Sequence, residues 1–199
     1  QLVGADKETL REKMQSAADV FVVELTEQTE LPDEQLTKMK DDYCRMGIET
    51  AVDDYGTGYS NITNLLRYMP NYVKIDRMLL TDIQDSPQKQ HFVSEIVTFA
   101  HDNDIMALAE GVETTEELET VIELGVDLIQ GYYTAKPAAE PIASIPAEIK
   151  SEIIRYQHIR MKKTGLETYI AGRENRVSTV KVASQKYRTI YIPSEGEIH

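Results

Sequence analysis

Short apolar runs rich in β-branched residues alternate along the chain with longer segments whose apolar residues recur at helical spacing. The apolar runs cover residues 20–23, 48–52, 72–75, 105–109 and 127–129. The helical segments between them cover residues 32–47, 61–69, 87–103 and 115–124. Alternating strands and helices are typical of a parallel sheet with crossover helices, so the pattern predicts an α/β fold.

Two of the predicted helices carry start and stop signals in the sequence. Pro32 stands where the first should begin and Gly47 where it should end, the arrangement that helix termini favour. Thr114 can cap the segment 115–124, and Gly125 can end it. These signals fix the predicted helix boundaries independently of the apolar pattern.

Each predicted strand ends in a polar side chain. In chain order these are Glu24, Asp53 with Asp54, Lys74 with Asp76, Glu110, and Gln130. In a (β/α)₈ barrel the carboxyl ends of the strands converge on the active site. One such residue could be an ordinary solvated loop residue, but the whole set predicts a TIM-type (β/α) barrel with a polar rim.

The chain is too short for a complete barrel, which has eight units and about 250 residues. About five units are visible in the 199 residues, and a helix predicted over 6–18 precedes the first strand. Residues 1–164 are therefore predicted to form the C-terminal portion of a barrel, and 165–199 a small C-terminal extension of unknown role. A partial barrel should have unpaired edges at its first and last strands. We expect it to form a homodimer or to associate with a missing N-terminal segment.

The composition limits the classes of binding partner that we expect for the chain. The net charge of −13 disfavours nucleic acid polymers and anionic membranes. The sequence has no apolar run near the ~18–20 residues that span a bilayer, and no signal peptide at its start. The single cysteine, Cys44, excludes an intrachain disulfide and fits a cytoplasmic location. We predict that Cys44 is buried on its helix. A small anionic substrate could still bind where acidic clusters hold cations.

Five short motifs occupy the predicted strand ends. Residues 24–27 read Glu-Leu-Thr-Glu, 53–60 read Asp-Asp-Tyr-Gly-Thr-Gly-Tyr-Ser, 74–76 read Lys-Ile-Asp, 109–114 read Ala-Glu-Gly-Val-Glu-Thr, and 130–132 read Gln-Gly-Tyr. In order and spacing this set resembles the EAL-domain family of cyclic di-GMP phosphodiesterases. The resemblance covers roughly residues 21–137. It implies metal-dependent hydrolysis of cyclic di-GMP to linear pGpG in bacterial second-messenger signalling.

The chemistry of the motif residues agrees with that resemblance. Phosphodiester hydrolysis needs a nucleophilic water and neutralised phosphoryl oxygens, and two adjacent hard cations supply both. Oxygen ligands suit Mg²⁺ or Mn²⁺. The resemblance implies that Glu24 and Asp53 bind a first metal and that Asp54 belongs to a second. An Asp-Asp pair without the surrounding motif, by contrast, occurs more often in helix caps and turns than in metal sites.

The resemblance also implies roles for the other motif residues. It implies that Lys74 acts on the nucleophilic water, for which a lysine serving as base needs a lowered pKa. Glu110 would be a metal or water partner, and Gln130 would hydrogen-bond a metal-bound water or Lys74. Glu27 matches the residue that anchors the glycine loop 56–58. Asp76 and Glu113 are expected to support the site or to contact substrate.

One feature of the family is absent. No Glu-Ala-Leu sequence occurs in the chain, nor does the strand-borne Asn that precedes the segment 24–27 in the family. Both are metal ligands there, so the first metal would lack two ligands. We therefore expect this chain alone to be inactive. The alternative to an enzyme is a catalytically inactive cyclic di-GMP receptor or interaction module.

Overall fold

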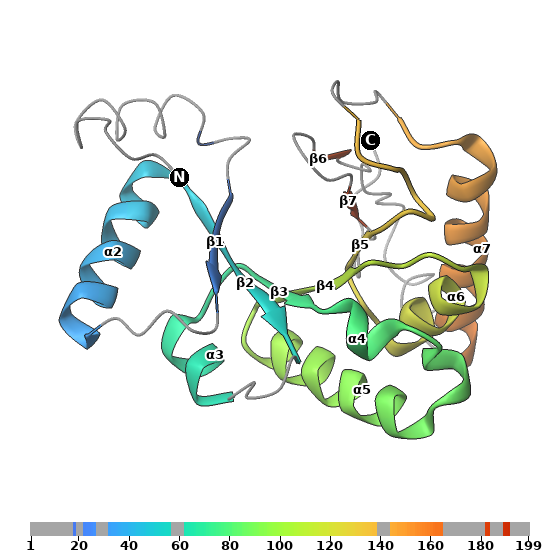
Figure 1. The fold of residues 1–199 in the computed structure, drawn as a ribbon, viewed down its shortest axis with the longest axis horizontal. Coiled ribbons are helices and arrows are strands. Elements are labelled where there is room, and N and C mark those ends of the chain that lie inside the picture. Colours follow the sequence, from blue (N-terminus) through green and yellow to red (C-terminus); the bar gives the residue numbers. More distant parts are fainter. Residues whose placement is uncertain are drawn as a thin grey trace, which may run out of the picture.

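The computed structural model describes Ala18 and residues 22–26, 32–56, 62–138, 144–164, 182–183 and 189–191. A sheet crosses the middle of the molecule, with α2 and α3 near one end and α5, α6 and α7 around the other (Figure 1). Within this described part, no helix is long and apolar enough to cross a membrane.

The strands are neighbours in the order in which they follow one another along the chain. They are β1 (Val22–Thr26), β2 (Glu49–Tyr55), β3 (Tyr72–Ile75), β4 (Met106–Glu110) and β5 (Leu128–Gln130). Each pairs in parallel with the next. Parallel neighbours end at the same edge of a sheet, so the polar residues at their carboxyl ends lie side by side. The predicted α/β fold with a parallel sheet is confirmed, whereas closure into a barrel stays a prediction.

The helices follow the sequence signals closely. Their bounds are α2 (Asp33–Met46), α3 (Ile62–Tyr68), α4 (Arg77–Leu80), η2 (Ile83–Asp85), α5 (Pro87–Asp102), α6 (Thr115–Leu124) and α7 (Ala147–Thr164). Gly47 adopts a left-handed conformation at the end of α2, as Gly125 does after α6. Thr114 accepts a hydrogen bond from the Glu117 N–H and completes a capping box. The predicted boundaries of α2, α3, α5 and α6 are confirmed to within about two residues, whereas α4 and η2 were not predicted.

The core lies between the sheet and the helices that cover it. Val73, Ile75, Ala107 and Ala109 of the central strands are fully buried. The inner face of α5 contributes Val93, Ile96 and Val97, and that of α6 contributes Leu118, Val121 and Ile122. α5 packs against β4, and α6 packs against α5 and α7, so close packing in the core supports the strand that carries Glu110.

Two predictions about exposure and pairing are wrong. β5 does not have an open edge, because β7 (Thr189–Tyr191) pairs with it in antiparallel fashion, and β6 (Val182–Ala183) pairs with β7. The extension therefore supplies the cover that the partial barrel was expected to lack there. Cys44 is exposed, since α2 buries little beyond Leu36. The helix predicted over 6–18 lies outside the described residues, apart from Ala18.

Candidate functional site

Three carboxylates from three strands converge on one lysine. The Nζ atom of Lys74 lies 2.6 Å from Asp53 Oδ1, 3.0 Å from Glu24 Oε1 and 3.0 Å from Glu110 Oε2. Its side chain is only 5% exposed. Lys74 belongs to β3, and its partners belong to β1, β2 and β4. The structure thus brings together four of the residues that the sequence placed on one rim.

The carboxylates determine the charge state of Lys74. Burial alone would lower the pKa of its ammonium. Hydrogen bonds to Asp53, Glu110 and Glu24 outweigh burial and raise the pKa above its ordinary value. Lys74 is therefore a protonated hydrogen-bond donor in this arrangement, not a free amine.

Negative charge is in excess around that ammonium. Burial raises the pKa of Glu110, and its contact with Lys74 offsets this only in part. The pKa of Asp54 is raised by burial and by the nearby charges of Asp53 and Asp76. A cluster with more carboxylates than cations attracts a further positive charge, which is the property that a metal site requires.

A bulge in β2 sets the directions of Asp53 and Asp54. Val52 pairs with Val73 and Tyr55 with Ile75, so three steps along β2 match two along β3. Asp54 has φ of 56°, in the left-handed region that aspartate tolerates better than most residues. The extra residue breaks the alternation of faces. Asp53 can then point at Lys74 while Tyr55 is buried.

Glycine is required where β5 ends beside the loop after β4. The Gln130 carbonyl accepts hydrogen bonds from the backbone N–H groups of Gly111, at 2.7 Å, and Val112, at 3.1 Å. A Cβ atom on Gly131 would lie 2.2 Å from the carbonyl oxygen of Val112. The Gln130 side chain is buried at this junction. The Gln-Gly pair of the motif therefore serves close backbone packing as well as any chemistry.

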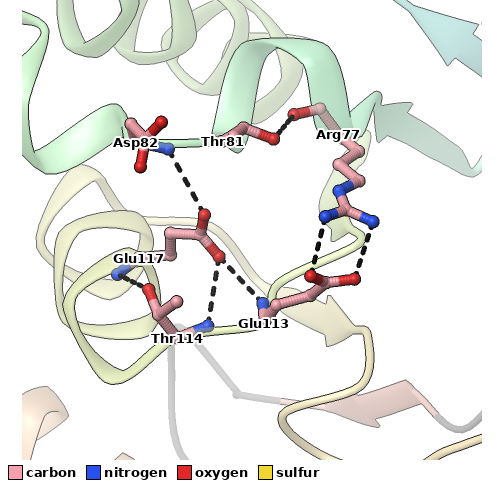
Figure 2. A network of polar contacts seen from close by, with 6 residues as sticks. All are labelled: Arg77, Thr81, Asp82, Glu113, Thr114 and Glu117. Atoms are coloured by element: carbon pink, nitrogen blue, oxygen red, sulfur yellow. Dashed lines mark hydrogen bonds and ion pairs between the residues drawn. The ribbon is translucent and has the colours of Figure 1, made fainter.

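Asp76 and Glu113 organise the loops beyond the strands. Asp76 Oδ1 accepts a hydrogen bond of 2.7 Å from the Met78 N–H and caps α4. Glu113 forms two contacts with the guanidinium of Arg77 (Figure 2). Arg77 was not singled out by the sequence, because its partner is 36 residues away and no local pattern joins them. Glu117, also overlooked, had a local signal in the Thr-x-x-Glu capping pattern.

The donor atoms suit a hard divalent cation in kind. Glu24, Asp53 and Asp54 offer only carboxylate oxygens, which Mg²⁺ and Mn²⁺ prefer. Yet within the described ranges no group of three or more His, Cys, Asp or Glu residues is arranged to hold a metal ion. The carboxylates converge on the Lys74 ammonium instead. Glu27 and the loop residues 57–61 lie outside the described part.

The chain is similar in sequence to proteins named as cyclic di-GMP phosphodiesterases. The chain is 33% identical over 117 residues to the probable cyclic di-GMP phosphodiesterase PdeN of Escherichia coli strain K12. This match covers 59% of the chain and 23% of PdeN. The chain is also 35% identical over 95 residues to the cyclic di-GMP phosphodiesterase RocR of Pseudomonas aeruginosa. That match covers 48% of the chain and 24% of RocR. The chain thus spans about a quarter of these relatives.

Solved structures agree with the fold. A standalone EAL protein from Vibrio cholerae O395, in its cyclic di-GMP-bound form, matches with a TM-score of 0.64 and 29% identity. The match covers 72% of this chain and 64% of that one. Klebsiella pneumoniae BlrP1, in a complex with manganese and cyclic di-GMP, gives a TM-score of 0.60 and 32% identity, over 66% of this chain and 34% of that one. The EAL domain model itself matches residues 7–137. With its motif residues gathered at adjacent strand ends, the chain belongs to the EAL domain family.

Proposed function

We propose that this chain forms the C-terminal part of a metal-dependent phosphodiesterase that hydrolyses cyclic di-GMP to linear pGpG. The observation that carries the proposal is the convergence of Glu24, Asp53 and Glu110 on Lys74. Relatives named as cyclic di-GMP phosphodiesterases support the reaction, and neighbours crystallised with cyclic di-GMP support the ligand. A homodimer and a cytoplasmic location belong to the same proposal.

The metal would be held by Glu24, Asp53 and Asp54, as one or two Mg²⁺ or Mn²⁺ ions. Neighbouring structures hold manganese or calcium with cyclic di-GMP, which supports a divalent cation. When bound, such a cation lowers the pKa of water and neutralises charge on phosphoryl oxygens. Ligands beyond these three would have to come from outside the described residues or from water.

Lys74 is proposed to act as a cation and hydrogen-bond donor. Hydrogen bonds to Asp53, Glu110 and Glu24 raise the pKa of Lys74 and support its role as a cation in this arrangement. An ammonium fixed by three carboxylates is already oriented, so it can position a water or stabilise charge developing on phosphate without reorganising. Glu110 and Gln130, at the ends of the next two strands, are proposed to orient the same water.

The test is an assay of linear product with the full-length gene product. Turnover should require Mg²⁺ or Mn²⁺ and should be abolished by EDTA. Asp53→Asn keeps the size of the side chain but removes one metal-binding charge, so it should lower kcat by at least about a hundredfold. Full turnover by Asp53→Asn in the presence of EDTA would exclude the metal mechanism.

A cyclic di-GMP receptor is the second candidate. It is favoured by the engagement of all three carboxylates with Lys74, because an ion-paired cluster is stable without a metal. Calorimetry with Ca²⁺ or EDTA separates the two functions. A receptor binds the dinucleotide equally well in both and forms no product with Mg²⁺ or Mn²⁺.

A further inference from the structure

The loops that follow β3 and β4 are joined by a two-pronged ion pair. Arg77 Nη1 lies 2.6 Å from Glu113 Oε1, and Arg77 Nη2 lies 2.7 Å from Glu113 Oε2. Two parallel contacts fix the relative orientation of both groups as well as their distance. Figure 2 shows the two side chains reaching toward each other from α4 and from the loop before α6.

A buried carboxylate makes a second connection between the same loops. Glu117 Oε2 accepts hydrogen bonds from the N–H groups of Glu113, at 2.8 Å, and Thr114, at 3.1 Å. Its Oε1 atom accepts one of 3.3 Å from the N–H of Asp82, just beyond α4. Glu117 is only 5% exposed. One carboxylate thus holds backbone groups of both loops at once (Figure 2).

The two loops also touch through a glycine. Gly111 has φ of +86°, and a Cβ atom there would lie 2.8 Å from Arg77 Cβ and 2.9 Å from Arg77 Cγ. Only glycine combines this backbone conformation with such a close approach. The stem of Arg77 therefore packs directly against the backbone that follows Glu110.

The spacing of these contacts relates them to the candidate site. Arg77 is three residues after Lys74, and Glu113 is three residues after Glu110. Lys74 and Glu110 are themselves ion-paired at 3.0 Å. The ion pair beyond the strand ends therefore repeats the connection between the same two strands.

We propose that Arg77, Glu113 and Glu117 form an inter-loop clamp that positions Glu110 against Lys74 for the phosphodiester reaction; the inference rests on the proposed function. They are positioning residues, because their observed contacts are with one another and with backbone. The Arg77 side chain is 52% exposed, and an ion pair so open to water contributes little to stability. Its effect should appear in the rate, since catalysis is sensitive to small displacements of the reacting groups.

The test compares kcat, KM and thermal midpoint for Arg77→Met, Glu113→Gln and the double variant of the full-length gene product. Each single variant should lower kcat by about 10- to 100-fold, with KM changed less than about threefold. The double variant should be no slower than the worse single variant, because both changes break one contact. Arg77→Lys should lose less than Arg77→Met, since it keeps the charge.

Glu123→Gln is the matched control. Glu123 pairs with Lys163 across α6 and α7, at the opposite end of α6 from the clamp. It should leave kcat and KM unchanged. A rise in KM larger than the fall in kcat would mean that Arg77 contacts substrate, and multiplicative losses in the double variant would mean that the two residues act separately. Either result overturns the clamp, as does an unchanged kcat in both single variants.

A readout that does not need turnover separates this inference from the proposed function. The Lys74 ammonium should give a slowly exchanging ¹⁵N signal, identified by its absence in Lys74→Met. In Arg77→Met and Glu113→Gln that signal should broaden or disappear, whereas Glu123→Gln should retain it. If the wild type binds cyclic di-GMP without hydrolysing it, the proposed function fails but this prediction still applies. An unchanged Lys74 signal in both clamp variants overturns the inference whatever the activity.

Discussion

Replacing Lys74 by methionine tests how the site is held together. Methionine fills a similar volume but removes the charge that three carboxylates share. Asp53, Glu24 and Glu110 would then repel one another across a few ångströms with no ammonium between them. We expect Lys74→Met to fold less stably than the wild type in EDTA.

The magnitude follows from the exposure of the partners. Breaking a buried ion pair by removing one partner costs about 3–5 kcal/mol. Here the lysine side chain is 5% exposed, but those of Glu24, Asp53 and Glu110 are 46%, 20% and 27% exposed, so water relieves part of the repulsion. We expect a loss of about 2–3 kcal/mol near pH 7.5. For a chain of this size that is a fall of roughly 4–12 °C in the thermal midpoint.

The loss of stability in Lys74→Met should be larger at alkaline pH than at acidic pH. The pKa of Lys74 is raised in the folded state, so its contribution is fully present below its ordinary pKa and is lost only at more alkaline pH. The pKa of Glu110 is already raised by burial and should rise further without the ammonium. A carboxyl with a raised folded-state pKa destabilises the fold above that pKa and less as the pH falls through it. The cost of Lys74→Met should therefore be smaller at pH 5 than at pH 8.

Urea unfolding followed by circular dichroism at pH 5 and pH 8 would measure this difference. Lys163→Met is the control, because Lys163 also pairs with a glutamate but its side chain is 63% exposed. Its cost should be small at both pH values, because water screens an ion pair this exposed. Mn²⁺ should restore part of the stability of Lys74→Met by replacing the missing positive charge. An equal cost at both pH values, or a cost no larger than that of Lys163→Met, would refute the reasoning.

Three further predictions concern other parts of the chain. Gly131→Ala should lower the free energy of unfolding by about 2–4 kcal/mol, because the new Cβ would lie 2.2 Å from the Val112 carbonyl oxygen. Gly47→Ala is the control: its Cβ has open space, so it should lower the free energy of unfolding only by the smaller strain of the left-handed φ. Glu27→Ala should reduce kcat without abolishing dinucleotide binding, because we expect Glu27 to anchor the glycine loop. A loss of affinity in calorimetry that exceeds the loss of kcat in the product assay would contradict that role. The 199-residue chain alone should show no measurable phosphodiesterase activity and should self-associate in light scattering. A 22.6 kDa monomer that turns over cyclic di-GMP at an ordinary rate would contradict this.

What the sequence could predict was governed by local rules. Thr114 and Gly125 define α6 through capping and a left-handed glycine, and both act within one helical turn. The gathering of Glu24, Asp53, Lys74 and Glu110 could be predicted because parallel strands end at one edge, which follows from topology alone.

The features that escaped prediction depend on contacts distant along the chain. The Arg77–Glu113 pair has no local signature, because either residue alone looks like a solvated loop residue. The pairing of β7 with β5 joins residues about sixty positions apart, and short alternating runs do not specify a partner. The exposure of Cys44 depends on what packs on α2, which helical periodicity alone does not determine.

The bulge in β2 constrains how this family member can change over evolutionary time. Tyr55 lies on the buried face because one extra residue precedes it in the pairing with β3. Deleting Asp53 or Asp54 would remove that extra residue, so two steps along β2 would match two along β3; the aromatic ring would stay opposite Ile75, and the rim would lose one carboxylate. Exchanging either aspartate for a neutral residue of the same size leaves the register intact. The rim can therefore lose one of these carboxylates by substitution, which keeps the bulge, or by deletion, which restores the regular alternation of the strand.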